Sequence, residues 1–318
     1  MEPLISVVIP LYNKQRYISQ AIDSVLSQTV QDFELIIVND GSKDQGPEIV
    51  NTYDDQRIVL INQKNQGVSV ARNCGISVAK ADIVAFLDAD DEWLPNFLET
   101  ILLLRQKYPS AGMYGTGYAL YTDGKHKRDN VWKPDLEERT LISYFAESVS
   151  SGFPIIITSS FAAPRKLLKE IGGYQNEFRT GQDHDLFGRL ALFYEVAYSP
   201  KLCAHYNAGA ENNVDKPKFV LETPLIRYLE GCSIEERVKL FQFPNLQLYL
   251  EFWYLKTGGR NVYAGYCREG RKQLRQVHNT RYSLQKIIFF GLSYLPLPLY
   301  LLPADIVRRI TNKMKLST

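Results

Sequence analysis

The sequence has few cysteines, and the four it contains lie far apart, at Cys74, Cys203, Cys232 and Cys267. Their spacing matches no paired metal-ligand motif, so it argues against a zinc site of that kind and against a disulfide framework. The first residues also lack the basic stretch and the cleavage site of a secretory signal peptide. We therefore expect a cytoplasmic protein with reduced thiols.

Three ligand-binding motifs are missing as well. No G-x-G-x-x-G follows the first apolar run and no G-x-x-x-x-G-K-[ST] occurs, so neither a dinucleotide fold nor a P-loop is supported. Asp88, Asp90, Glu92 and Glu99 match acidic positions of an EF-hand loop. Trp93, however, stands where that loop requires glycine, which excludes it.

Short apolar runs alternate with helix-like segments in the first part of the chain. The runs are residues 4–10, 33–40, 57–63 and 82–88, and the helix-like segments are residues 16–28, 47–53 and 67–81. This order predicts an α/β fold with a mainly parallel sheet covered by helices on both faces. In such folds ligands bind beyond the carboxyl ends of the strands. Polar and turn-forming residues end or follow all four runs, among them Pro10, Tyr12, Asn13, Asp40, Asp88 and Asp90.

Three carboxylates crowd the end of the last of these runs, in "FLDADDEWLP". Packed like charges repel one another, so a fold tolerates Asp88, Asp90 and Asp91 together only where solvent, a cation or a cationic partner balances them. Asp88 and Asp90 are two residues apart and project to the same side of an extended chain. We expect them to share a metal ion through oxygen ligands.

Four segments resemble the family 2 glycosyltransferases, which have the GT-A fold. They are "ISVVIPLYNKQRYISQAIDSVLSQ", "FELIIVNDGSKD", "NQGVSVARNCGI" and "IVAFLDADDEWLPNFLE", and the resemblance covers roughly residues 4 to 206. It implies transfer of a sugar from a nucleotide-diphosphate donor to an acceptor hydroxyl. A carboxylate at Asp40 suits the ring N–H of uracil, which favours a UDP-sugar, although it would also suit the donor edge of guanine. The resemblance also implies inversion at the anomeric carbon and the assistance of Mn²⁺ or Mg²⁺.

The resemblance assigns roles around the donor. Asp88 and Asp90 match the family's D-x-D, the metal and diphosphate site. His205 matches a residue that joins the metal or diphosphate in some relatives; the alternative is that it is a structural or exposed histidine. Asp91 either helps to hold the ribose or metal, or caps the following helix. Asp40 matches an acid that hydrogen-bonds the nucleobase, Tyr12 an aromatic near the base, and Arg72 a cation near the base or phosphate. Pro10 and Asn13 belong to the same donor loop.

The acceptor side is expected in "GQDHDLFGRL", residues 181–190. The resemblance makes Asp183 the general base, with Asp185 as a supporting substrate-binding residue; the alternative is that one of them caps the helix. Gln182 stands where the family usually has Glu. Trp93 is expected either to flank the acceptor or to anchor the core.

The two ends of the chain carry opposite charge. Residues 256–318 contain twelve Lys and Arg against Glu269 and Asp305, a net charge of +10, which leaves −8 for residues 1–255. Residues 287–304 carry no charge but contain three prolines, and a single membrane span needs about 20 apolar residues. We expect this run to lie on or dip into a membrane surface; the alternative is a helix hairpin packed on the protein itself.

The expected protein is therefore a GT-A domain at residues 1–218 followed by a helical, basic and apolar region at 219–318. We expect a metal-dependent, inverting glycosyltransferase on the inner face of the cell membrane. Its partners would be a sugar nucleotide and a saccharide or lipid-linked saccharide acceptor, as in surface polysaccharide or glycolipid synthesis, and nucleic acid is not expected. Two alternatives are a sugar-nucleotide nucleotidyltransferase and a non-catalytic sugar-nucleotide-binding or scaffold protein.

Overall fold

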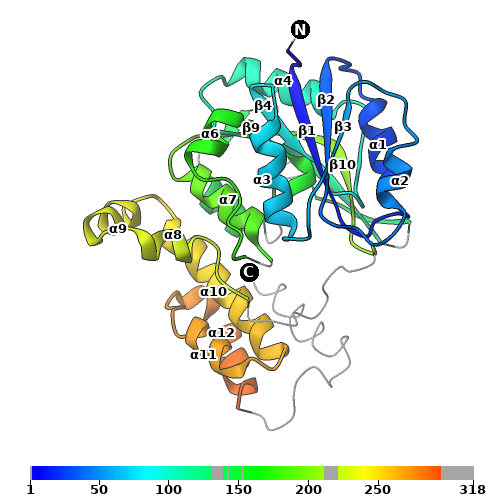
Figure 1. Ribbon diagram of the computed structural model, residues 1–318. Helices are drawn as coiled ribbons and strands as arrows, with labels where there is room; N and C mark the ends of the chain where they lie inside the picture. Colours follow the sequence, from blue (N-terminus) through cyan, green and yellow to red (C-terminus); the bar gives the residue numbers. More distant parts are fainter. Residues whose placement is uncertain are drawn as a thin grey trace. The chain divides into compact units, whose positions relative to one another are not determined.

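A computed structural model of the chain describes residues 2–122, 124–130, 139–141, 143–151, 154–178, 180–210 and 221–294. The chain divides into two compact units, Met1–Asn213 and Val214–Thr318. The first unit is a mixed α/β structure and the second is helical (Figure 1).

A single twisted sheet forms the centre of the first unit. Among the described residues its strands are β1 (Ile5–Leu11), β2 (Phe33–Asn39), β3 (Ile58–Asn62), β4 (Ile83–Phe86), β5 (Glu92–Trp93), β6 (Met113–Thr122), β7 (Lys125–Asn130), β8 (Arg139–Leu141), β9 (Phe161–Pro164) and β10 (Val196–Asn207). Their order is β3-β2-β1-β4-β9-β6-β10-β5, with β7 beside β6 and β8 beside β10. The predicted mainly parallel α/β sheet is confirmed.

The direction of the strands decides which loops meet. β1 is parallel to β2 and β4, β2 is parallel to β3, and β6 is parallel to β10. β9 is antiparallel to both β4 and β6, so β6 and β10 run in the same direction as β4. The carboxyl ends of β1, β2, β4, β6 and β10 therefore share one edge of the sheet.

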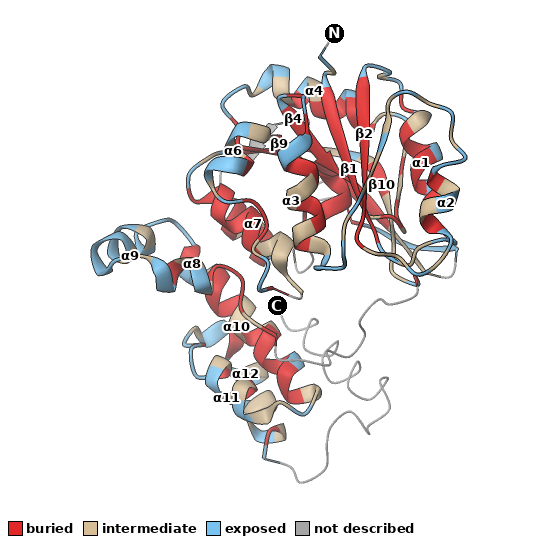
Figure 2. Cartoon of the chain, in the orientation of Figure 1, coloured by how far each residue is buried: buried red, intermediate tan, exposed pale blue. Residues whose placement is uncertain are grey.

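Helices cover both faces of this sheet. They are α1 (Ile18–Leu26), α2 (Gly46–Val50), α3 (Val68–Val78), α4 (Phe97–Lys107), α5 (Tyr144–Ser150), α6 (Arg165–Glu170) and α7 (Gln182–Ala191), with a 3₁₀ turn, η1, at Thr158–Ser160. Every residue of β1 and β2 is buried, as expected for strands covered on both sides (Figure 2). Alternate residues of β1, from Ile5 to Leu11, pack in one core with α1 and α4.

The opposite face of β1 is covered by α3, and a glycine makes the close approach possible. A Cβ atom placed on Gly75 would lie 2.3 Å from Cγ1 of Val8, so no larger residue fits there without a shift. Arg72 lies on the same helix, one turn nearer its beginning. The packing of Gly75 on Val8 therefore helps to set the position from which Arg72 reaches the edge of the sheet.

The second unit consists of helices α8 (Ile226–Gly231), α9 (Ile234–Phe241), α10 (Leu246–Tyr263), α11 (Cys267–Leu274) and α12 (Ser283–Leu292), with a 3₁₀ turn, η2, at Thr280–Tyr282. α10 and α11 approach closely, since a Cβ atom on Gly270 would lie 2.8 Å from the carbonyl oxygen of Gly258. None of the residues of α9 or α12 is buried.

The uncharged run predicted at residues 287–304 is described only in part. Residues 287–292 belong to α12, whereas residues 295–304 lie outside the described residues. In the part of the chain that the structure covers, no helix has the length and apolar character needed to cross a bilayer.

Candidate active site

The three carboxylates that follow β4 lie at the shared carboxyl edge of the sheet, and two of them are paired with cations of the chain. Nη2 of Arg72 lies 2.5 Å from Oδ1 of Asp88, and Nζ of Lys14 lies 2.6 Å from Oδ2 of Asp90. The pairs join three segments, because Lys14 follows β1 and Arg72 belongs to α3. The positive charge that the sequence predicted beside these acids is thus supplied in part by the protein.

Asp91 is the most deeply buried of the three acids. Its Oδ2 accepts a hydrogen bond of 2.5 Å from the hydroxyl of Ser159, and its Oδ1 accepts one of 2.8 Å from the backbone N–H of Asn207. Burial, and then the charges of Asp90 and Asp88, raise the pKa of Asp91 well above its usual value. Burial and Asp88 also raise the pKa of Asp90, although Lys14 opposes the shift. The cluster is therefore a place where added positive charge is stabilising.

A divalent cation fits Asp88 and Asp90 on the chemistry of its ligands. Mg²⁺ is commonly held by one or two carboxylates together with substrate phosphates and water, rather than by a cage of protein ligands. No three His, Cys, Asp or Glu side chains among the described residues form a set able to hold a metal ion. His205, the predicted third ligand, lies with Nδ1 3.4 Å from Oε2 of Glu92 and its ring against Tyr121. The arrangement thus supports the two aspartates and gives no support to His205 as a ligand.

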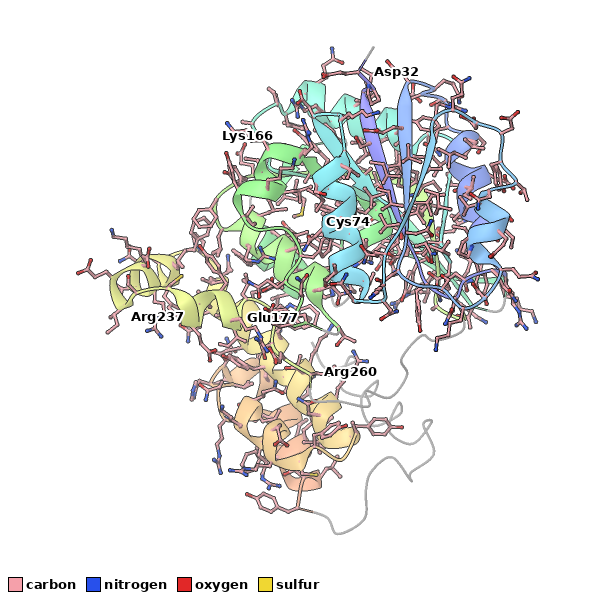
Figure 3. All side chains as sticks on the ribbon, viewed as in Figure 1. Asp32, Cys74, Lys166, Glu177, Arg237 and Arg260 are labelled. Atoms are coloured by element: carbon pink, nitrogen blue, oxygen red, sulfur yellow. The ribbon has the colours of Figure 1, made fainter. Side chains whose placement is uncertain are left out.

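Arg72 is buried yet incompletely bonded. Its side chain is 3% exposed, and neither Nε nor Nη1 has a hydrogen-bond partner in the described structure. The guanidinium carbon lies 5.0 Å from the ring centroid of Tyr174, a distance suited to a cation–π contact. Burial lowers the pKa of Arg72, but the charge and the hydrogen bond of Asp88, with a smaller contribution from the charge of Asp183, raise it overall. Arg72 is a permanent cation with two unused donors at the edge of the acid cluster (its helix α3 is marked by Cys74 in Figure 3).

Asp40 lies just after β2 and organises the loop that leads into α3. Its Oδ1 accepts hydrogen bonds from the side chain of Gln63 and the backbone N–H of Gln66, and its Oδ2 accepts one from the N–H of Gly67. Gly67 has a φ of 95°, a left-handed conformation that suits glycine. Asp40 is thus fixed at the predicted donor edge, with its oxygens already serving three donors.

The loop after β1 contains the other predicted donor residues. Pro10 is a buried residue of β1 paired with Val38, whereas Tyr12 is 41% exposed. Asn13 adopts a left-handed φ of 52°, and its side-chain Oδ1 accepts a hydrogen bond of 2.8 Å from the N–H of Lys43. Tyr12 is consequently free to lie against a ligand, while Asn13 has a structural contact to the neighbouring loop.

Asp183 lies in the first turn of α7. Its Oδ1 accepts a hydrogen bond of 2.9 Å from the N–H of His184, the residue that follows it. Its negative charge contributes to raising the pKa of Arg72, and it acts in the same direction on Tyr174 and Tyr206, whose pKa values are raised first by burial. Asp88 acts on the same three side chains. The fold thus brings Asp183 into the electrostatic neighbourhood of the D-x-D.

Asp185 faces the opposite way. It is fully buried, and its Oδ2 accepts a hydrogen bond of 2.8 Å from Nε of Arg189, one turn further along α7. The other guanidinium nitrogens of Arg189 donate to the carbonyl oxygens of Ile171 and Gly173. These contacts favour a role in holding α7 in place rather than the predicted contact with substrate.

Trp93 occupies the core rather than an open pocket. It is 2% exposed, its ring stacks on Phe97 with centroids 4.0 Å apart, and its Nε1 donates a 2.7 Å hydrogen bond to the carbonyl oxygen of Ser159. Of the two roles that the sequence left open, this position favours the core anchor.

Several residues of the site were not anticipated from the sequence. They are Lys14, Ser159, Tyr174, Tyr206 and Asn207. Lys14 directly follows Pro10, Tyr12 and Asn13, which mark this loop as part of the predicted donor site. The sequence pattern does not show which side chain of the loop reaches the acids. The remaining four come from distant segments that only the folded sheet brings to Asp88, Asp91 and Arg72.

Comparison with known proteins agrees with this geometry. Residues 6–172 match the model of the family described as Glycosyl transferase family 2. An uncharacterized glycosyltransferase of Rickettsia prowazekii is 34% identical over 201 residues, which are 60% of this chain and 61% of that protein. One from Rickettsia felis is 29% identical over 297 residues, 89% of this chain and 47% of that protein. The chain thus spans less than two thirds of the length of either relative.

Solved structures of S. aureus TarS share the fold. Residues 1–349 of TarS in complex with UDP-GlcNAc have a TM-score of 0.62 at 15% identity, with 91% of this chain and 89% of that chain covered. The complex of the same TarS fragment with UDP has a TM-score of 0.58 over the same shares of the two chains, again at 15% identity. The expected GT-A fold is confirmed by these likenesses. The match to the family model extends over more than half of the chain, and the chain therefore belongs to glycosyltransferase family 2.

Proposed function

We propose that the protein transfers a sugar from a UDP-sugar to an acceptor hydroxyl by a single, metal-assisted displacement that inverts the anomeric carbon. The observation that carries this proposal is the ion pair of Asp88 with the buried Arg72 at the carboxyl edge of the sheet. The charges of Asp88 and Asp183 both act on that guanidinium. A site of this kind offers carboxylates for a cation, a fixed positive charge for phosphate and a carboxylate for a proton.

On the donor side, Asp88 and Asp90 would hold Mn²⁺ or Mg²⁺. When bound, the metal ion would stabilise the negative charge that develops on the departing diphosphate. The free Nε and Nη1 of Arg72 would donate to phosphate oxygens, which are the acceptors that a guanidinium matches best. Asp91 is bonded to Ser159 and Asn207 and would hold the segment that carries Asp88 and Asp90 in position.

Tyr12 and Asp40 would receive the nucleoside. An exposed tyrosine can stack on a base, and a carboxylate can accept the ring N–H of uracil. The Asp40 oxygens retain acceptor capacity, because each carboxylate oxygen has two lone pairs and three donors use them now. UDP is preferred because TarS, which has the same fold, is solved with UDP-GlcNAc and with UDP.

Asp183 would act as the general base. As the acceptor oxygen forms its bond to the anomeric carbon, the bond from that carbon to the diphosphate breaks and its electron pair leaves with UDP. The acceptor proton passes to the carboxylate of Asp183, which retains an oxygen not used by the hydrogen bond from His184. Because attack and departure occur on opposite faces of one carbon, the product has inverted configuration.

The second unit would place the enzyme on the inner surface of the cell membrane, where it would act on a saccharide or lipid-linked acceptor. Leu284 and Ile287 of α12, and Tyr294 just beyond it, are 61%, 67% and 63% exposed. Leu284 and Ile287 are three residues apart and therefore lie on one side of α12. Between residues 267 and 294 six Lys and Arg accompany the single acid Glu269. An exposed apolar stripe beside cations suits an anionic lipid surface.

The direct test is a calorimetric binding screen of UDP-, GDP- and dTDP-sugars with and without Mn²⁺, followed by measurement of nucleotide release with candidate acceptors. Metal-dependent binding of a UDP-sugar, lost in Asp88→Ala/Asp90→Ala, is the expected result. Arg57→Met, which removes the ion pair between Arg57 and Asp55 just before β3, is the matched control. Equal binding of all donors by the double variant and the wild type would reject this donor site.

A further inference from the structure

The loop that carries Lys14 is fixed by contacts to the loop after β2. The N–H of Lys43 donates to Oδ1 of Asn13 at 2.8 Å, and the N–H of Gln15 donates to Oδ2 of Asp44, also at 2.8 Å. The residues on either side of Lys14 are therefore both tied to that neighbouring loop. As a result, the direction in which the Lys14 side chain leaves the backbone is set by the fold.

That side chain ends at the acid cluster. Nζ of Lys14 lies 2.6 Å from Oδ2 of Asp90, and the two side chains are only 15% and 14% exposed. An ion pair of this burial is screened much less than one on the surface. The ammonium uses one side of Oδ2 of Asp90, so a divalent cation bound on that side would have to displace it, and one bound elsewhere on the carboxylate would meet its positive charge.

Lys14 differs from the other cation of the cluster in the flexibility of its side chain. Arg72 is buried, and its planar group lies over Tyr174, so its place beside Asp88 is fixed. Lysine has a flexible four-carbon stem and a compact charge, so its ammonium can exchange one oxygen for another when a second anion is within reach. Lys14 is thus the member of the cluster that can give way.

We propose that Lys14 competes with the divalent cation for Asp90 and thereby makes cation binding depend on the sugar nucleotide. The inference rests on the proposed function, because it requires a metal ion at Asp88 and Asp90. The ammonium opposes entry of a metal ion that arrives alone. A diphosphate that arrives with the metal brings negative charge that accepts the displaced ammonium, so metal and nucleotide bind cooperatively, and each strengthens the other equally.

The test compares Mn²⁺ binding, by calorimetry on the full chain, with and without UDP. In Lys14→Gln we expect Mn²⁺ alone to bind at least about fivefold more tightly than in wild type, the lower end of coupling between sites. We also expect the tightening produced by UDP to shrink. Lys14→Arg keeps the charge and should behave as wild type. Lys43→Gln removes an exposed lysine from the neighbouring loop and controls for general electrostatics.

The outcomes separate the inference from the proposed function. Unchanged or weaker Mn²⁺ binding in Lys14→Gln, with wild type binding Mn²⁺ in the presence of UDP, would overturn the competition while leaving the metal site standing. Equal tightening in Lys43→Gln would overturn it too, because the effect would then not belong to Asp90. Absence of Mn²⁺ binding to wild type even with UDP would reject the metal part of the proposed function and this inference with it. Thermal melting confirms folding, and Lys14→Met repeats the test if the Gln variant unfolds.

Discussion

Nη2 of Arg72 donates to Oδ1 of Asp88 across 2.5 Å, and this contact joins the helix after β3 to the segment after β4. Among the described residues Nε and Nη1 of the guanidinium have no hydrogen-bond partner, although Arg72 is buried. Buried donors without partners are costly unless a ligand satisfies them. The geometry of this pair therefore points to an anion that completes it.

Replacement of Arg72 should weaken donor binding in proportion to those lost bonds. Arg72→Met removes charge-assisted hydrogen bonds worth about 1.5–3 kcal/mol, so the Kd for the UDP-sugar should rise at least about tenfold. Arg72→Lys should recover part of the loss, because it keeps the charge but not the two-nitrogen geometry. Titration calorimetry measures both. A Met variant that binds the donor as wild type does would remove Arg72 from the phosphate site.

Asp183→Asn should lower the catalytic rate without weakening the binding of the donor. The amide oxygen can still accept the hydrogen bond from the N–H of His184, so the start of α7 keeps its structure. The amide cannot take the acceptor proton, and kcat should fall by about 10²–10⁴. Donor Kd and melting temperature should stay within error of wild type. Turnover at the wild-type rate in this variant would exclude Asp183 as the base.

Asp185→Asn should lower the stability of the fold, in contrast to Asp183→Asn, although the two residues are only two positions apart. The change leaves the guanidinium of Arg189 buried and uncompensated, and breaking such a pair typically costs about 3–5 kcal/mol of unfolding free energy. Urea unfolding should show this loss, with Asp183→Asn as the matched control. If the Asn variant were as stable as wild type, the ion pair would not be what holds α7.

Asp91 should make stability depend on pH in a direction that its pKa fixes. Its folded-state pKa is raised, so the ionised side chain destabilises the fold; this cost begins to fall as the pH drops through the raised pKa and is gone below the ordinary pKa of the unfolded chain. With a chelator present at neutral pH, Asp91→Asn should melt about 2–4 °C above wild type, the shift that 1 kcal/mol produces in a domain of this size. The advantage should shrink as the pH is lowered. An advantage that grew toward acid pH would contradict the assignment.

Much of the first unit could be predicted because its signals are local. Continuous apolar runs gave β1, β2, β3 and β4, and each begins and ends close to the predicted residues. The insertion of β9 between β4 and β6 could not be read in the same way, since it depends on pairing between residues far apart in the chain. That strand nevertheless decides that β6 and β10 share an edge with β4.

The candidate site shows the same division between local and distant information. Asp88, Asp90 and Arg72 stand in sequence motifs, and the structure brings them together. The motif around Asp183 and Asp185 could not show that Asp183 is only partly buried while Asp185 is fully buried and bonded to Arg189, although the two residues are only two positions apart on α7. Lys14 was missed for a related reason, since its reach to Asp90 depends on contacts with the loop after β2.

Membrane binding by the second unit should depend on the exposed stripe of α12. Leu284→Glu/Ile287→Glu places two acids among the cations of residues 267–294, so binding to vesicles containing phosphatidylglycerol should fall at least about tenfold. Sedimentation with vesicles measures the bound fraction, with Val78→Glu on α3 as an exposed control and phosphatidylcholine vesicles as the uncharged surface. Wild-type binding should also weaken as salt is raised, because attraction between separated surface charges is screened. Equal binding of the double variant and wild type would mean that α12 does not face the lipid. Failure of the wild type itself to bind would reject the membrane surface as a partner.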